Sequence, residues 1–140
     1  MTFMTRIVIT GLVAIHLAAS LWHGSAHTQL AIALTPAKTV FVFAVILLAP
    51  LIAAALIWTR CKRVGLWVFS LSMLGAFLFG TVHHYVLVSN DNVHHLPEGS
   101  PESLSQFVTS AAVIALLELA SALFGVYCLS SRQLRSRPGA

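Results

Sequence analysis

The sequence contains very few charged residues. Only 9% of its 140 residues are Asp, Glu, Lys or Arg, four of them acidic and eight basic, whereas 58% are hydrophobic. About a quarter of the residues of a soluble domain are charged, so this chain cannot cover a water-facing surface. The composition therefore excludes a soluble globular protein and predicts a small helical bundle in a lipid bilayer.

Cysteines and common catalytic motifs are scarce too. The two cysteines, Cys61 and Cys128, both fall near the side that we expect to face the cytoplasm, where a structural disulfide is disfavoured. The chain has no glycine-rich phosphate loop, serine elbow, CxxC pair or internal repeat. These absences give no support to a disulfide scaffold or to the common nucleotide-binding and hydrolase classes.

Four apolar stretches lie between the charges, and each is long enough to cross a bilayer as a helix. They are expected at residues 7–22, 39–59, 64–88 and 105–128. Polar segments flank them: a basic inner loop at 60–63, an outer loop at 89–104 and a basic C-terminal tail at 131–140. The predicted fold is an all-α membrane protein, a single four-helix transmembrane bundle over residues 1–140.

Two local features affect the shape and the ends of these spans. Pro50 is expected to kink the second span, because proline removes a backbone donor and its ring clashes with the preceding turn. The stretch 24–34 either continues the first helix, lies along the membrane interface or loops, and the sequence leaves these alternatives open.

The basic residues predict the orientation of the bundle. Of the eight, only Lys38 falls on one side, and the others fall on the opposite side: Arg6, Arg60, Lys62, Arg63, Arg132, Arg135 and Arg137. The positive-inside rule then places both termini in the cytoplasm and the protein in the plasma (inner) membrane as a multi-pass protein. Because the basic residues are split over three short segments, they indicate membrane insertion and no nucleic-acid partner.

An alternative concerns the N-terminus. Arg6, an apolar run and small residues such as Ala18 and Ala19 also fit a secretory signal peptide. Cleavage would leave three spans and remove His16. We favour the uncleaved helix, because His16 interrupts the apolar core that a signal peptide requires.

Histidines follow one face of the first span. His16, Ser20, His23 and His27 fall at offsets of 0, 4, 7 and 11, and at 100° per residue their directions agree to within about 60°. Such a narrow polar stripe is expected to face protein. His23 and His27 are spaced so that both can contact one metal ion.

Most histidines are expected at the outer end of the bundle. His83 and His84 end the third span, but neighbouring residues diverge by about 100°, so only one of them can aim at the first helix. The candidate metal ligands are His23, His27, His83, His84, His94 and His95. Of these, His23, His83 and His84 are also candidates for holding a haem b between the first and third helices.

A second polar site is expected deeper in the membrane. Glu118 shares a face of the fourth span with the small residues Ala111, Ala115 and Ala122, a pattern suited to close helix packing. An intramembrane carboxylate needs a partner. His16 is the other ionisable group at comparable depth, so we expect these two side chains to form a hydrogen-bonded pair.

Three functions fit these features. The first is a redox or metal-handling subunit that binds haem b or an iron, copper or zinc ion at its outer histidines. The second is a structural or assembly subunit of a larger membrane complex or homo-oligomer, and the third is a small proton or cation transporter that uses His16 and Glu118. We favour the first.

An enzyme is the less favoured interpretation. The spacing of His23 and His27 and the paired histidines resemble the histidine boxes of di-iron membrane desaturases and hydroxylases over these short motifs alone. Those boxes use an HxxHH form on the cytoplasmic side, whereas here the pairs lack the preceding histidine and are expected outside. No catalytic residue is therefore predicted.

Overall fold

The computed structural model describes the backbone of residues 1–135 and the side chains of residues 1–131. It is helical, with no strand in that part of the chain. The elements are α1 (Phe3–Gln29), α2 (Pro36–Phe41), η1 (Val42–Leu48), α3 (Ala49–Leu56), α4 (Lys62–Thr81), η2 (Val82–Val86) and α5 (Pro101–Arg135). Arg137, in the predicted basic tail, lies outside the described residues, and so do the side chains of Arg132 and Arg135.

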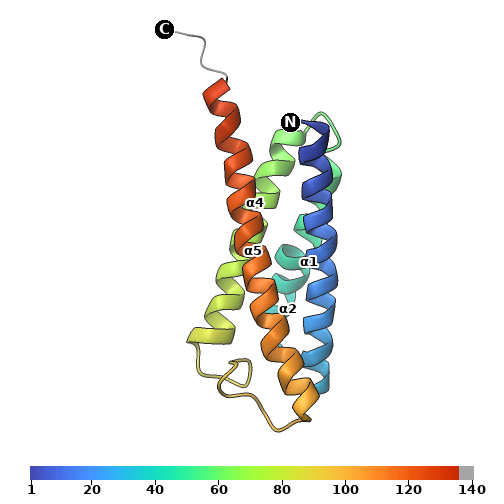
Figure 1. Cartoon of the computed structure of the whole chain (residues 1–140). Helices are drawn as coiled ribbons and strands as arrows, with labels where there is room; N and C mark the ends of the chain where they lie inside the picture. The colour runs from blue at the N-terminus through green and yellow to red at the C-terminus, as the bar shows by residue number, and fades with distance from the viewer. Residues whose placement is uncertain (136–140) are drawn as a thin grey trace.

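These elements form four helices long and apolar enough to cross a membrane: Phe3–Gln29, Pro36–Leu56, Lys62–Val86 and Pro101–Ser131. The N-terminus and the end of α5 lie at one end of the bundle, and the long loop between η2 and α5 lies at the other (Figure 1). The four predicted apolar stretches are thus confirmed as helices. Which end faces the cytoplasm remains a prediction from the basic residues.

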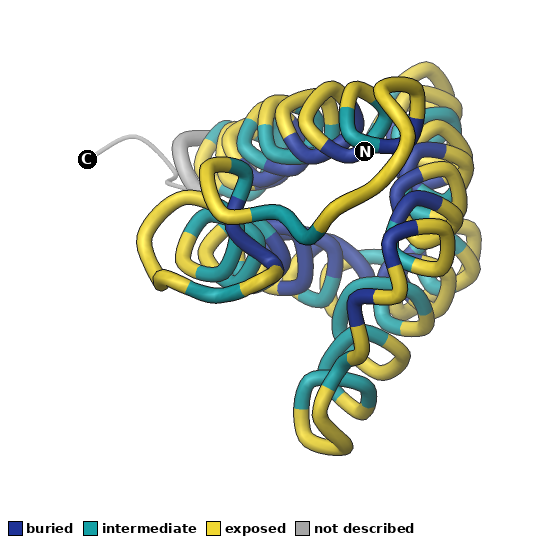
Figure 2. Tube along the Cα trace, turned by 90° about the horizontal axis from the view of Figure 1, so that it is seen from below, coloured by how far each residue is buried: buried dark blue, intermediate teal, exposed yellow. Residues whose placement is uncertain are grey.

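Buried residues line the sides of the helices that face the bundle interior, and exposed residues lie on the outside (Figure 2). At the end that carries the termini, the core consists of Ile9, Ile57, Leu66, Phe69 and Met73 with their neighbours. At the opposite end a smaller cluster contains Ala26, Leu30, Ile32 and Phe107. Large apolar side chains such as Leu71 and Leu116 are exposed, as expected for surfaces that contact lipid.

The second span is irregular at the place where proline interrupts it. Pro50 lacks an N–H and its ring crowds the carbonyl four residues earlier, so regular α-helical bonding cannot continue through this point. The chain widens into the π-helical segment η1 directly before it, and the Ala49 N–H donates to the Ala44 carbonyl, five residues back. The predicted interruption is therefore a π-helical segment.

This irregular span contacts α4 along its length, through Phe41 and η1 as well as α3, but packs against α1 only over its second half. α3 packs against α4 and α1, whereas α2 has its main contacts with η1, the next element along the chain. Neither α2 nor η1 contains a buried residue. The first half of the second span therefore stands away from α1 and α5.

The first helix is longer than the predicted 7–22 and does not stop at Gly24. It continues to Gln29 and ends in a compact cap, in which Ala31 adopts the left-handed conformation with φ 52°. The Ala31 N–H donates to the Thr28 carbonyl at 3.2 Å, and the Ile32 N–H donates to the His27 carbonyl at 2.9 Å. This pair of bonds is a Schellman motif, which fixes the last helical turn and the histidine it carries.

Candidate metal centre

Three histidines meet at the end of the bundle opposite the termini. His23 and His27 come from the last turns of α1, and His84 comes from η2. Their ligand nitrogens lie within 4.8 Å of one another. His23 is buried and the other two are partly buried. We call His23, His27 and His84 the histidine triad.

The three histidine rings approach one another at their Nε2 atoms. The Nε2 of His23 lies 3.2 Å from the Nε2 of His84 and also 3.2 Å from the Nε2 of His27. Two nitrogens that bind one zinc ion at about 2.05 Å in tetrahedral geometry are about 3.3 Å apart. The spacing of the triad therefore suits a single small ion.

Hydrogen bonds on the far side of the His23 ring determine its tautomer. The Ser110 hydroxyl donates to the Gln106 carbonyl at 2.6 Å, so its oxygen accepts the hydrogen bond from His23 Nδ1 at 2.8 Å. We therefore assign the proton of neutral His23 to Nδ1. This leaves a lone pair on Nε2, directed at the other two histidines.

His84 is held in the same tautomer by the main chain. Its Nδ1 donates to the carbonyl of Asp91 at 2.9 Å, and a carbonyl can only accept. The backbone of His84 is fixed as well, because its carbonyl accepts from the Val93 N–H at 3.0 Å. The Nε2 lone pairs of His23 and His84 thus face each other with no proton between them, an arrangement that a shared cation stabilises.

A buried carboxylate accompanies the triad. Asp91 Oδ1 lies 3.2 Å from His84 Nδ1 and 3.4 Å from His27 Nε2, and Oδ2 lies 3.4 Å from the ammonium of Lys38. Burial alone would raise the pKa of this carboxyl, but the hydrogen bond from His84 and the positive charge of Lys38 act in the opposite direction, and the pKa lies below its usual range. Asp91 is therefore a charged outer partner of His84, which it contacts at the ring nitrogen that faces away from the triad, whereas it approaches His27 at Nε2.

One aromatic ring covers the triad on the inside of the bundle. Phe107 is fully buried, and its ring centroid lies 4.8 Å from that of His23, 5.1 Å from that of His27 and 5.4 Å from that of His84. A hydrophobic neighbour of this kind limits the access of water to the ligands.

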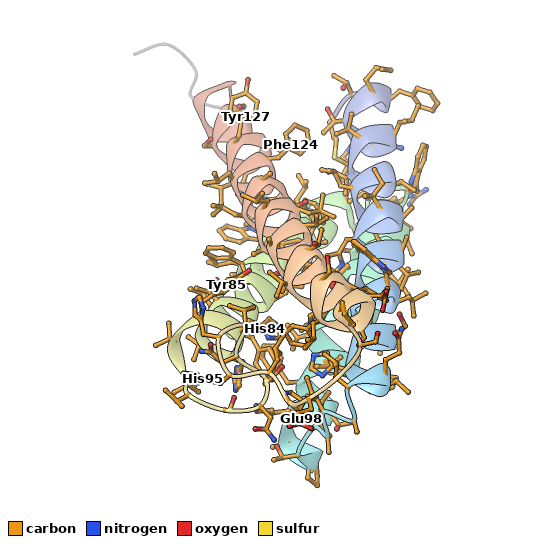
Figure 3. The ribbon with its side chains drawn as sticks, turned by 60° about the horizontal axis from the view of Figure 1, so that its bottom comes forward. His84, Tyr85, His95, Glu98, Phe124 and Tyr127 are labelled. Atoms are coloured by element: carbon orange, nitrogen blue, oxygen red, sulfur yellow. The ribbon has the colours of Figure 1, made fainter. Side chains whose placement is uncertain are left out.

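The remaining outer histidines lie elsewhere. The ring of His83 packs against that of Phe79 at an angle, with their centroids 4.2 Å apart, and its Nδ1 donates to the Phe79 carbonyl at 2.9 Å, so His83 turns away from the triad. His94 and His95 are exposed in the loop between η2 and α5. Figure 3 shows His84 at the loop end of the bundle, with His95 farther out on the loop. Of the six candidate ligands, the structure brings only the triad together.

The deeper pair expected from the sequence does meet. His16 Nε2 lies 3.0 Å from Glu118 Oε1, and both side chains are at least 98% buried. This contact joins α1 to α5 midway along the bundle. Gly80 of α4 lies beside it, since a Cβ built on Gly80 would be 4.0 Å from Glu118 Oε2 and 3.8 Å from the His84 ring.

A cavity of about 640 Å³ connects the two polar sites. His23, His27, His84 and Asp91 line one part of it and Glu118 lines another. Most of the remaining wall is apolar and comes from α1, η1, α4 and α5, with residues such as Ile46, Phe79 and Ile114. Three histidine ligands leave a further coordination position on an ion, and the triad faces this cavity.

Sequence reasoning did not identify two of the residues that organise the triad. Ser110 is an ordinary helix residue with no motif around it, and only its hydrogen bond to His23 reveals its role. Asp91 was assigned only to the outer loop, although its position in the polar run from Ser89 to Asn92 indicates a turn that can fold back. No protein-family model, curated protein or solved structure matches this chain, so the site is interpreted from its own geometry.

Proposed function

We propose that this protein is a small integral membrane protein that binds one transition-metal ion, iron, copper or zinc, through the histidine triad and serves as a metal-handling or redox subunit. The observation that carries this proposal is the pair of Nε2 atoms of His23 and His84, 3.2 Å apart, each with its Nδ1 hydrogen-bonded to an acceptor. Neutral imidazole with a fixed tautomer is a common ligand of such ions.

A bare ion fits the triad better than haem b. The iron of a bis-histidine haem holds two axial nitrogens on opposite faces of a flat macrocycle. The nitrogens of His23 and His84 are 3.2 Å apart, and the third nitrogen, from His27, is equally close to that of His23. No porphyrin fits between rings arranged in this way.

A transporter based on His16 and Glu118 has less support. The part of the bundle between this pair and the termini is filled mainly by apolar side chains such as Leu66, Phe69 and Met73, and its buried polar groups include the hydroxyls of Ser70, Ser72 and Ser121. Among the described residues, the polar cavity wall stops at Glu118. A relay would need a polar path through that apolar core.

The test is the elemental metal content of the detergent-purified protein, which carries an affinity tag without histidines. We expect about one transition-metal ion per chain in the parent. His23→Ala and His84→Ala should lose it while still inserting into the membrane, because each removes one of three ligands.

His83→Ala and His95→Ala are matched controls, since both remove an outer histidine that lies outside the triad. They should keep the metal content of the parent. A parent with no metal after loading with zinc, copper or iron would overturn the proposal and favour the assembly-subunit interpretation. Loss of metal only in the His83 or His95 variants would relocate the site.

A further inference from the structure

The cavity beside the triad carries polar groups whose hydrogen-bonding capacity is only partly used by the described residues. The Ser20 hydroxyl is buried without a hydrogen-bond partner among the described residues, and Ser20 lines the cavity. Glu118 lines it as well, and the hydrogen bond from His16 engages Oε1, leaving Oε2 near Gly80. A few convergent polar groups in an otherwise apolar wall are typical of a small-molecule site.

The size and the wall residues of the cavity indicate what kind of molecule would fit it. Its volume of about 640 Å³ falls within the range of about 300–1,000 Å³ that is usual for ligand pockets. Ile46, Phe79, Ile114 and Ala115 form apolar walls from three different spans. The shape therefore suits a mainly apolar molecule with one polar end at the triad.

The entrance of the cavity lies where the second span stands away from the bundle. Gly24 and Thr28 of α1 and Phe43 of η1 line the cavity and are exposed. Gly24 has open space where a side chain would begin. Because α1 and η1 belong to helices of membrane-spanning length, a molecule that enters between them comes from the lipid phase.

We propose that the cavity binds a lipid-soluble small molecule whose polar end, a carbonyl, hydroxyl or similar oxygen donor, takes the free coordination position of the metal ion, while its apolar body lies against η1, α4 and α5. This inference rests on the proposed metal site. The Ser20 hydroxyl is the hydrogen-bonding group that positions the polar end.

The probes are two hydroxamic acids with the same metal-binding group and different tails, octanohydroxamic acid and acetohydroxamic acid. They are titrated into the Co²⁺-loaded protein in lipid nanodiscs, and the visible absorption of Co²⁺ reports the change of ligand. Both should change the spectrum of the parent, because both can reach the free coordination position.

The decisive variant is Ala115→Phe, which places a bulky side chain on the apolar wall of the cavity at a residue that is not a metal ligand. It should weaken octanohydroxamate about tenfold, the effect of losing the burial of about two methylene groups. Acetohydroxamate affinity should change by less than about twofold, because the head group alone does not reach that wall. Ala112→Phe is the matched control: the neighbouring Ala112 is exposed on α5, so affinity for both acids should be that of the parent.

The outcomes separate the two proposals. A parent that takes up no Co²⁺ overturns the metal site and this inference with it. A parent that binds Co²⁺, with Ala115→Phe leaving octanohydroxamate affinity unchanged, overturns the inference alone. If Ala115→Phe loses Co²⁺, Ile46→Trp on the opposite wall replaces it, with the same expected tenfold effect and the same contradicting result.

Discussion

The hydrogen bond between Ser110 and His23 controls which ring nitrogen of His23 can bind a metal. Without an acceptor at Nδ1, the proton of neutral imidazole is free to move to Nε2, where it blocks coordination. Removing such an outer partner typically reduces metal affinity by about 10- to 100-fold. Ser110 therefore belongs to the candidate metal centre, although it does not lie among the ligands.

Ser110→Ala should accordingly weaken metal binding by about tenfold or more while the three ligands remain in place. The measurement is a competition titration of the loaded protein with a chelator of known affinity. Ser72→Ala is the matched control, because Ser72 is a buried helical serine that donates to a main-chain carbonyl, that of Phe69, far from the triad. Equal affinities in the two variants would show that Ser110 does not orient His23.

For the individual residues of the site, the sequence predicted part of the arrangement. The spacing of His23 and His27 on a single helix face required only helical periodicity, so it was visible without a structure. The sequence alone did not show which of His83 and His84 joins the triad, because this depends on the π-helical segment η2 and on the Phe79 ring that holds His83. Ser110 and Asp91 join the triad only through tertiary contacts.

Among the elements, α1 and α5 are joined at two levels. Near the loop end, the Gln106 side-chain amide donates to the Trp22 carbonyl and the Ser25 hydroxyl. Midway along the bundle, His16 meets Glu118 in a buried contact. An unpartnered polar group is costly in an apolar interior, so each residue of this pair depends on the other.

A double-mutant cycle on this pair tests that dependence. His16→Leu and Glu118→Leu should each lower the free energy of unfolding by about 1–3 kcal/mol, because each leaves a buried group without its hydrogen bond. The double variant should lose less than the sum of the two, with a coupling of about 1 kcal/mol. The measurement is reversible unfolding in detergent micelles. Strictly additive losses would show that the contact contributes nothing as a pair.

Comparing the observed helices with the predicted spans shows which features periodicity and composition can predict. The four apolar stretches appeared as helices because length and hydropathy suffice to identify them. Their ends were less well defined: the first and fourth apolar stretches were expected at about 7–22 and 105–128, with the course of 24–34 left open, and the helices that contain them run to Gln29 and begin at Pro101. Capping motifs such as the turn at Ala31 set these ends, and alanine gives no sign of a left-handed residue.

For the whole molecule, the distribution of basic residues predicts that the loop carrying Glu98 is outside and the turn carrying Cys61 is inside. Both positions are exposed and lie at opposite ends of the bundle. They therefore suit a labelling experiment. Neither cysteine is in a disulfide, so Cys61 is available as it stands.

Glu98→Cys in a Cys61→Ser, Cys128→Ser background should react with a membrane-impermeant maleimide on intact cells. Native Cys61 in a Cys128→Ser background should react only after the cells are permeabilised. The Cys61→Ser, Cys128→Ser protein without an added cysteine is the control for non-specific labelling. The reverse pattern would place the termini and Cys61 outside and contradict the predicted orientation.

The contact between Lys38 and Asp91 also determines the charge of the occupied site. The two opposite charges compensate each other, and the three histidines are neutral when they act as ligands. A divalent ion therefore adds two positive charges that this inner group of residues does not neutralise. In surroundings of low polarity, such an excess favours an anionic oxygen, such as that of a deprotonated hydroxyl, over a neutral carbonyl as the remaining ligand of the ion.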